Sequence, residues 1–137
     1  MTTVRVLLVD RNDDFLDAVN AWLGAAASVE VVGRSHSGAE AIARVEDLAP
    51  DVVVMDMALP DMSGLEATRR IKRRASAPFV VLTSFHGSRA ARTVAVDAGA
   101  DDCIAKADIT QDLLSVIARL VERRDAAEST GMRGENV

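Results

Sequence analysis

VRVLLVD, at residues 4–10, is the stretch that decides the fold class of this 137-residue chain. The run is almost continuously apolar and rich in valine and leucine, which is typical of a strand buried on both faces of a sheet. Four similar runs follow, each bounded by Pro, Gly, Asp or Ser: 29–33 (VEVVG), 51–56 (DVVVMD), 79–84 (FVVLTS) and 102–105 (DCIA). The sequence therefore predicts five strands.

Segments with the helical spacing of apolar residues follow each of these runs. They span residues 13–26, 38–48, 65–74, 88–98 and 109–124. A strand followed by a helix, five times over, predicts a parallel sheet with helices on both faces, because right-handed crossovers place the helices there. The expected fold class is α/β, a doubly wound parallel sheet of five strands.

The composition narrows the classes of function. The chain has 16 Lys and Arg against 21 Asp and Glu, a net charge of −5, with one Trp, three Phe and no Tyr. An acidic domain with so few aromatic rings is not expected to bind nucleic acid directly. Its one cysteine cannot form an internal disulfide, and no apolar run approaches the roughly 18 residues of a membrane-spanning helix. We therefore expect a cytoplasmic protein that does not insert into a membrane.

Length and patterning predict one domain, at residues 1–124. The segment 125–137 (DAAESTGMRGENV) is polar, contains glycine and shows no periodicity. It is therefore predicted to be a flexible tail or a linker stub.

Polar side chains stand where four of the predicted strands end. Asp10 ends the first strand and Asp56 the third; Thr83 and Ser84 end the fourth, and Lys106 follows the fifth. Ligands of open parallel sheets bind beyond the carboxyl ends of the strands. We therefore expect two carboxylates, a hydroxyl and an ammonium to converge on one edge of the sheet.

These strand ends resemble those of response-regulator receiver domains of two-component signalling. The resemblance covers about residues 4–124 and is carried by Val9-Asp10, residues 54–64 (VMDMALPDMSG), Leu82-Thr83-Ser84 and Ala105-Lys106. Among receivers, the chain resembles those that precede helix-turn-helix output domains. The resemblance implies a flavodoxin-like fold with strand order 2-1-3-4-5, and an interaction switch rather than a metabolic enzyme.

The resemblance also implies a role for each matching residue. Asp56 would be the phosphoacceptor, a carboxylate nucleophile that attacks the phosphorus of a kinase phosphohistidine or of a small phosphodonor. Lys106 would pair with the phosphoryl oxygens, and the hydroxyl of Thr83 would move to hydrogen-bond one of them. Asp10 would form an acidic pocket, and Mg²⁺ would lie between Asp10, Asp56 and the backbone carbonyl of Ala58.

Arg11 departs from the family pattern, because receivers usually carry a second acid at this position. A guanidinium cannot coordinate a cation and repels it. Three arrangements remain open. Asp10, Asp56 and the carbonyl of Ala58 could hold Mg²⁺ weakly; Arg11 could ion-pair with Asp56 and bias the domain toward its active arrangement without phosphate; or Arg11 could face solvent while an acid at 13–14 supplies the carboxylate.

Cys103 is the second departure. It lies three residues before Lys106, where many receivers place an aromatic ring that swings inward on activation. A small buried thiol on a strand is most often inert packing, so coupling between Thr83 and an aromatic switch is not expected here.

The partners implied by the resemblance are a sensor histidine kinase, an output domain or partner protein, and a second copy. The second copy would dock through the predicted fourth helix, fifth strand and fifth helix. One rival function is an atypical, phosphorylation-independent receiver, marked by Arg11. Another is an Asp-nucleophile phosphohydrolase of the haloacid-dehalogenase type, which needs a second acid where this chain has Ala58. A flavodoxin-like electron carrier would need a hydroxyl-rich phosphate loop at 11–14, which is instead anionic.

Overall fold

A computed structural model describes residues 3–135 of the chain. Its five strands are parallel and form one sheet in the order β2-β1-β3-β4-β5. The strands are β1 (Val4–Val9), β2 (Val29–Ser35), β3 (Val52–Asp56), β4 (Phe79–Ser84) and β5 (Asp102–Ala105). This confirms the doubly wound α/β fold and the strand order expected from the sequence. The chain order reverses between β1 and β3, which is where such sheets bind ligands.

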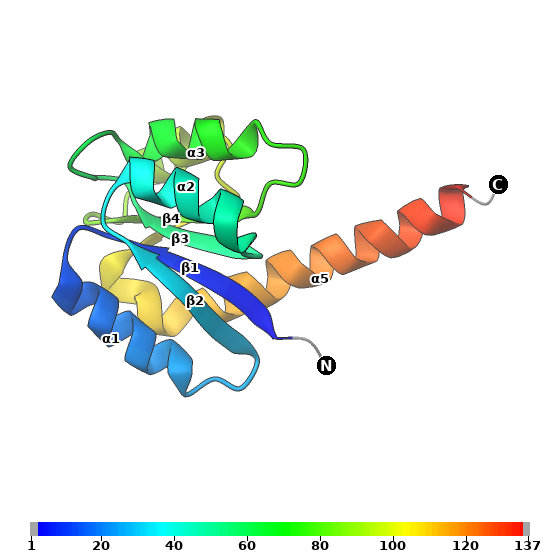
Figure 1. Cartoon of the computed structure of the whole chain (residues 1–137), viewed down its shortest axis with the longest axis horizontal. Helices are drawn as coiled ribbons and strands as arrows, with labels where there is room; N and C mark the ends of the chain where they lie inside the picture. The colour runs from blue at the N-terminus through cyan, green and yellow to red at the C-terminus, as the bar shows by residue number, and fades with distance from the viewer. Residues whose placement is uncertain (1–2, 136–137) are drawn as a thin grey trace.

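Helices alternate with the strands, as Figure 1 shows. They are α1 (Asp13–Gly24), α2 (Gly38–Leu48), α3 (Gly64–Lys72), α4 (Arg89–Asp97) and α5 (Ile109–Glu135), with a 3₁₀ turn, η1 (Lys106–Asp108), before α5. In Figure 1, α1 and α5 lie below the sheet and α2 and α3 lie above it. The sheet is therefore the middle layer of three.

The first four helices begin where the local sequence supplies a cap. A side-chain oxygen of the residue before each helix accepts a hydrogen bond from a backbone N–H three residues further on, which satisfies one of the free amides of the first turn. The capping residues are Asn12, Ser37, Ser63 and Ser88. These starts are local properties of the sequence.

Two apolar cores cover the two faces of the sheet. Successive residues of β1 alternate between them, with Val6 and Leu8 in the core beneath α1 and α5, and Leu7 and Val9 in the core beneath α2, α3 and α4. All five residues of β3 are buried. Burial on both faces explains why these strands appear in the sequence as continuous apolar runs.

The C-terminal segment differs from the expectation of a flexible tail or a linker stub, because much of it is helical. Helix α5 continues to Glu135, whereas a flexible tail was expected from residue 125. Residues 125–130 (DAAEST) contain neither glycine nor proline, so nothing in the next turn and a half stops a helix that the core has already nucleated. Arg124 adds an ion pair to Asp51 at 3.0 Å. The C-terminal part of α5 extends away from the sheet (Figure 1), and residues 136–137 lie outside the described part of the chain.

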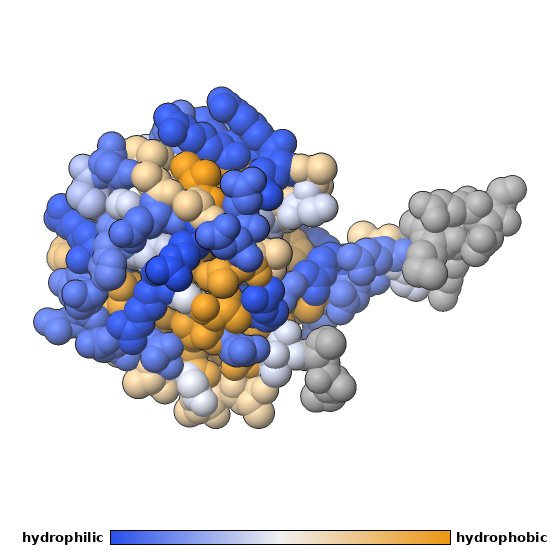
Figure 2. All heavy atoms as spheres, in the orientation of Figure 1, coloured by the Kyte–Doolittle hydropathy of each residue, from blue (hydrophilic) through white to orange (hydrophobic). Residues whose placement is uncertain are grey.

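The extra length of α5 does not make it a membrane helix. Its second half is polar in sequence, and Figure 2 shows mostly hydrophilic side chains on the coloured stretch of the helix between the body of the domain and the grey atoms. Among residues 3–135, no helix combines the length and the apolar character needed to cross a bilayer.

Candidate functional site

Asp10, Asp56 and Lys106 meet at the carboxyl edge of the sheet. Asp10 follows β1, Asp56 ends β3, and Lys106 opens η1 directly after β5. The ammonium Nζ of Lys106 donates hydrogen bonds to Oδ2 of Asp10 at 2.7 Å and to Oδ2 of Asp56 at 3.1 Å. The two acidic residues are 1% and 6% exposed. The ammonium therefore bridges two carboxylates that are almost removed from water.

Backbone amides hold the other oxygen of each carboxylate. The amide of Asn12 donates to Oδ1 of Asp10 at 2.8 Å, and the amide of Ala58 donates to Oδ1 of Asp56 at 3.1 Å. Each acid thus divides its two oxygens between a loop amide and Lys106. This division fixes the orientation of both carboxylates.

The surroundings of Lys106 keep it charged. Burial acts to lower the pKa of Lys106, but its hydrogen bonds to Asp10 and Asp56 and the charges of those acids outweigh burial, so the pKa lies above its ordinary value. The ring of Phe15 also lies against this group, with its centroid 4.6 Å from Nζ. At neutral pH the site therefore holds one ammonium and two acids.

Thr83 is the neighbour of Asp56 across the β3–β4 pair. The residue is 1% exposed, and its hydroxyl Oγ1 has no hydrogen-bond partner within the described residues. A buried hydroxyl without a partner costs about 1–3 kcal/mol, so such a group calls for an explanation. Next to it, Ser84 donates its hydroxyl to the carbonyl of His86 at 2.8 Å. Of the two hydroxyls at this strand end, only that of Thr83 is free to take a new partner.

The loop after Asp56 is anchored on both sides. A Cβ at Gly64 would overlap the carbonyl oxygen of Asp56, so only glycine allows this close approach. On the other side, the carboxylate of Asp61 accepts from the amides of Gly38 and Ala39, at 2.8 and 2.9 Å, at the start of α2. These two hydrogen bonds lower the pKa of Asp61. The sequence analysis missed Asp61, because its partners lie more than twenty residues away.

The sequence of this chain matches a known protein family. Residues 6–118 match the sequence model of the family described as the response regulator receiver domain. The chain belongs to this family. The match runs from within β1 to within α5, so the receiver domain includes each of the residues that meet at the carboxyl edge.

Curated relatives agree with this assignment. The receiver domain is 38% identical over 123 residues to a protein-glutamate methylesterase/protein-glutamine glutaminase of Alkalilimnicola ehrlichii, covering 88% of this chain and 32% of that protein. It is 35% identical over 118 residues to the response regulator protein VraR of Staphylococcus aureus, covering 85% of this chain and 56% of VraR. The chain thus spans between about a third and just over half the length of these relatives.

Solved structures show the same fold. The signal receiver domain of a response regulator NarL from Mycobacterium tuberculosis superposes with a TM-score of 0.83 at 25% identity, covering 89% of this chain and 98% of that one. A LuxR-family two-component response regulator from Aurantimonas sp. SI85-9A1 gives 0.82 at 27% identity, covering 88% and 86%. The expected resemblance is confirmed, including its subfamily. The phosphohydrolase, the electron carrier and the phosphorylation-independent receiver gain no support.

Arg11 takes the solvent-facing arrangement. It is exposed, and the ion pairs among residues 3–135 include none between Arg11 and Asp56, where Lys106 lies instead. Neither does Asp13 turn toward the site, because its carboxylate lies 2.5 Å from Nε2 of His36. Asn12 caps α1, which leaves the acids of the first turn at a helix N-terminus.

The oxygen atoms at this edge suit a magnesium ion. Carboxylate and carbonyl oxygens are the ligands that Mg²⁺ prefers, and the ion usually keeps several waters. Asp10, Asp56 and the carbonyl of Ala58 offer such a set, and two acids against one ammonium leave one negative charge uncompensated. The described residues contain no group of three or more His, Cys, Asp or Glu side chains arranged for a metal. The donors therefore fit a mostly hydrated ion.

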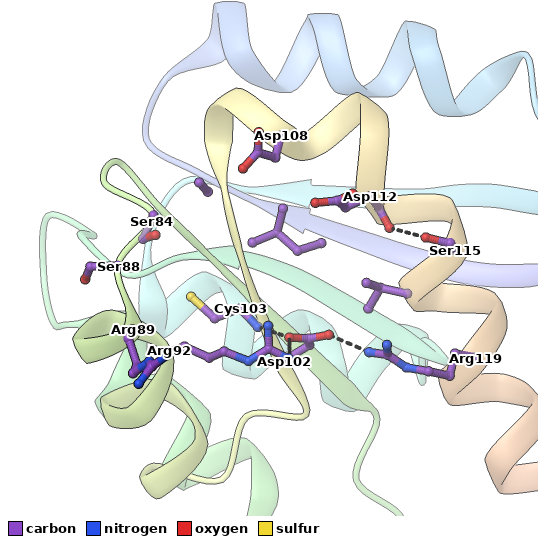
Figure 3. A pocket seen from close by; sticks show the side chains of 14 residues that line it. Ser84, Ser88, Arg89, Arg92, Asp102, Cys103, Asp108, Asp112, Ser115 and Arg119 are labelled. Carbon is purple, nitrogen blue, oxygen red and sulfur yellow. Dashed lines mark hydrogen bonds and ion pairs between the residues drawn. The ribbon is translucent and has the colours of Figure 1, made fainter.

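Cys103 lies in a groove of about 500 Å³ beside β5, between α4 and α5 (Figure 3). Burial raises the pKa of its thiol, which keeps it protonated at neutral pH. Beside it, the buried carboxylate of Asp102 pairs with Arg92 of α4 at 3.0 Å and with Arg119 of α5 at 2.6 Å. Asp102 thus ties both helices to the strand.

Proposed function

We propose that this receiver domain accepts a phosphoryl group on Asp56 and acts as a phosphorylation-controlled switch in a two-component pathway. The contact of Lys106 with both Asp10 and Asp56 carries the proposal. A carboxylate that is fixed by a strand end, open at one edge and paired with an ammonium suits nucleophilic attack on phosphorus.

The reaction is an in-line transfer. A carboxylate oxygen of Asp56 attacks the phosphorus of a kinase phosphohistidine, a new O–P bond forms, and the P–N bond breaks with its electron pair returning to the imidazole nitrogen. Lys106 neutralises the charge spread over the phosphoryl oxygens. The free hydroxyl of Thr83 then donates to one of those oxygens, which gives this buried group the partner it lacks.

Mg²⁺ bound by Asp10, Asp56 and the carbonyl of Ala58 would neutralise further phosphoryl charge. These residues supply few ligands, and Arg11 adds a positive charge nearby in the chain, so we expect the ion to bind weakly. All four carboxylate oxygens of Asp10 and Asp56 already accept a hydrogen bond from Lys106 or from a loop amide, so the ion would use their remaining lone pairs or replace a contact of Lys106.

The partners follow from the same switch. We expect a sensor histidine kinase as donor and an output domain or partner protein as receiver of the signal, in the cytoplasm. A second copy would dock on the face of α4, β5 and α5, where Arg92, Asp102 and Arg119 form the network drawn in Figure 3. No direct role in binding nucleic acid is proposed for this domain.

Intact-mass measurement tests the central claim. The protein is incubated with Mg²⁺ and phosphoramidate, and the expected result is a gain of one phosphoryl group that Asp56→Asn abolishes. Asp61→Asn serves as the matched control, since this acid lies in the same loop but contacts α2. Absence of any gain, or a gain that persists in Asp56→Asn, would overturn the proposal.

A further inference from the structure

Phe15 of α1 is a partly buried aromatic neighbour of the site. Its ring centroid lies 4.6 Å from Nζ of Lys106, well inside the roughly 6 Å range of a cation–π contact. In the part of the chain that the structure describes, the other two such contacts, of Lys72 and Arg124 with Phe79, are both 5.9 Å. The side chain of Lys106 is 22% exposed, so the ring replaces part of the water that would otherwise surround the ammonium.

A closed circuit of contacts determines where this ring lies. Oδ1 of Asp10 accepts from the amide of Asn12, and the side-chain oxygen of Asn12 accepts from the amide of Phe15 at 3.0 Å. The Phe15 ring contacts Lys106, whose ammonium donates a hydrogen bond to Oδ2 of the same Asp10. The acid that binds the ammonium therefore also orients the helix turn that carries the ring.

The ammonium gains order from this arrangement. Lysine has a flexible four-carbon stem, and holding its end in one place costs side-chain entropy. The π face attracts the cation without accepting a directed hydrogen bond from it, as a carboxylate does. The Nζ of Lys106 can therefore turn from Oδ2 of Asp56 to a phosphoryl oxygen while it stays over the ring. An incoming phosphoryl anion thus meets an ammonium that is already in position.

We infer that Phe15 is a positioning residue for phosphorylation, which holds the Lys106 ammonium over Asp10 and Asp56 before the phosphoryl group arrives. This role rests on the proposed function of Asp56. Trp22 is another partly buried aromatic residue packed against the same core, but the cation–π contact of Lys106 is with Phe15.

The experiment distinguishes the effect of the aromatic π face from the effect of side-chain volume. Phe15→Leu keeps an apolar side chain but removes the π face, Phe15→Tyr keeps the face, and Trp22→Leu removes a ring from the same helix and the same core. The rate of Asp56 phosphorylation is measured against phosphoramidate concentration with Mg²⁺ present. We expect Phe15→Leu to lower the maximal rate about threefold to tenfold with little change in the half-saturating concentration. Phe15→Tyr restores the rate, and Trp22→Leu leaves it unchanged.

A second measurement needs no phosphodonor. In ¹H–¹³C spectra, the ring current of Phe15 shifts the Lys106 ε-methylene signal upfield in the wild type and in Phe15→Tyr, and the shift disappears in Phe15→Leu. The role of Phe15 alone is overturned if the wild type is phosphorylated but Phe15→Leu reacts at the wild-type rate. It is also overturned if Trp22→Leu slows the reaction as much as Phe15→Leu does. A wild type that is never phosphorylated overturns the proposed function and this role together, even where the shift is present.

Discussion

The ammonium of Lys106 lies 3.1 Å from Oδ2 of Asp56, although fifty residues separate the two in the chain. The strand order makes the contact possible. β1 and β4 flank β3, and β5 lies beyond β4, so the residue that follows β5 must reach back over the sheet edge to meet Asp56 and Asp10. The length of the lysine side chain, with its charged end and apolar stem, suits this reach.

This contact predicts a loss of stability in alkaline solution. The pKa of Lys106 is raised on folding, so its contribution is complete below the ordinary value of 10.5 and is lost as the pH rises through the higher folded value. Replacing Lys106 with Met should lower the free energy of unfolding by about 1–2 kcal/mol at pH 7, and this difference should shrink above pH 10.5. Urea unfolding at several pH values measures it. Equal stabilities at pH 7 would show that the bridge contributes nothing.

Thr83→Val should weaken the binding of a phosphoryl mimic without lowering the stability of the domain. The Thr83 hydroxyl is buried without a partner, so an isosteric methyl group should leave the free energy of unfolding unchanged or raise it by up to about 1 kcal/mol. The same change removes a donor to the phosphoryl oxygens, and affinity for beryllium fluoride, a phosphoryl mimic, should fall about tenfold. Thr83→Ser keeps the hydroxyl and is the control. A variant that loses stability but binds the mimic normally would contradict this role.

Asp61→Ala should destabilise the loop after Asp56 at neutral pH. Hydrogen bonds from Gly38 and Ala39 lower the pKa of Asp61, so its contribution is present above the ordinary value of 3.8 and is lost as the pH falls through the lower folded value. The urea midpoint of Asp61→Ala should therefore lie below that of the wild type at pH 7, and the two should converge in acid. Asp47→Ala, at an exposed acid of α2, is the control. A constant difference across this pH range would assign the effect to packing.

Arg11→Asp should strengthen magnesium binding. The change removes a positive charge and adds a carboxylate directly after Asp10, so the Kd for Mg²⁺ should fall about tenfold. Arg11→Gln removes the charge without adding a ligand and should give only a small part of this gain. Isothermal titration calorimetry measures both variants. Equal Kd values for Arg11→Asp and the wild type would show that position 11 does not face the ion.

Local sequence patterns determined much of the fold. β4, β5 and α2 have the predicted bounds, and most other ends differ by one or two residues. The residues at the carboxyl edge of the sheet could also be predicted from the sequence, because each stands at a strand end: Asp10, Asp56, Thr83 and Lys106. Helix α5 is the exception, since the polar composition of residues 125–135 gave no periodic signal, and the helix persists only because its apolar first half is already folded on the sheet.

The sequence by itself thus determined the five strand–helix units, the helix caps and the residue types at the strand ends, because each depends on neighbours within a few positions. The tertiary structure alone decided that Lys106 bridges two acids, that Phe15 lies over its ammonium, that Asp61 caps α2 and that Arg11 stays exposed. These contacts join residues from separate elements, and their partners are selected by strand order and loop geometry, which no short stretch of sequence encodes.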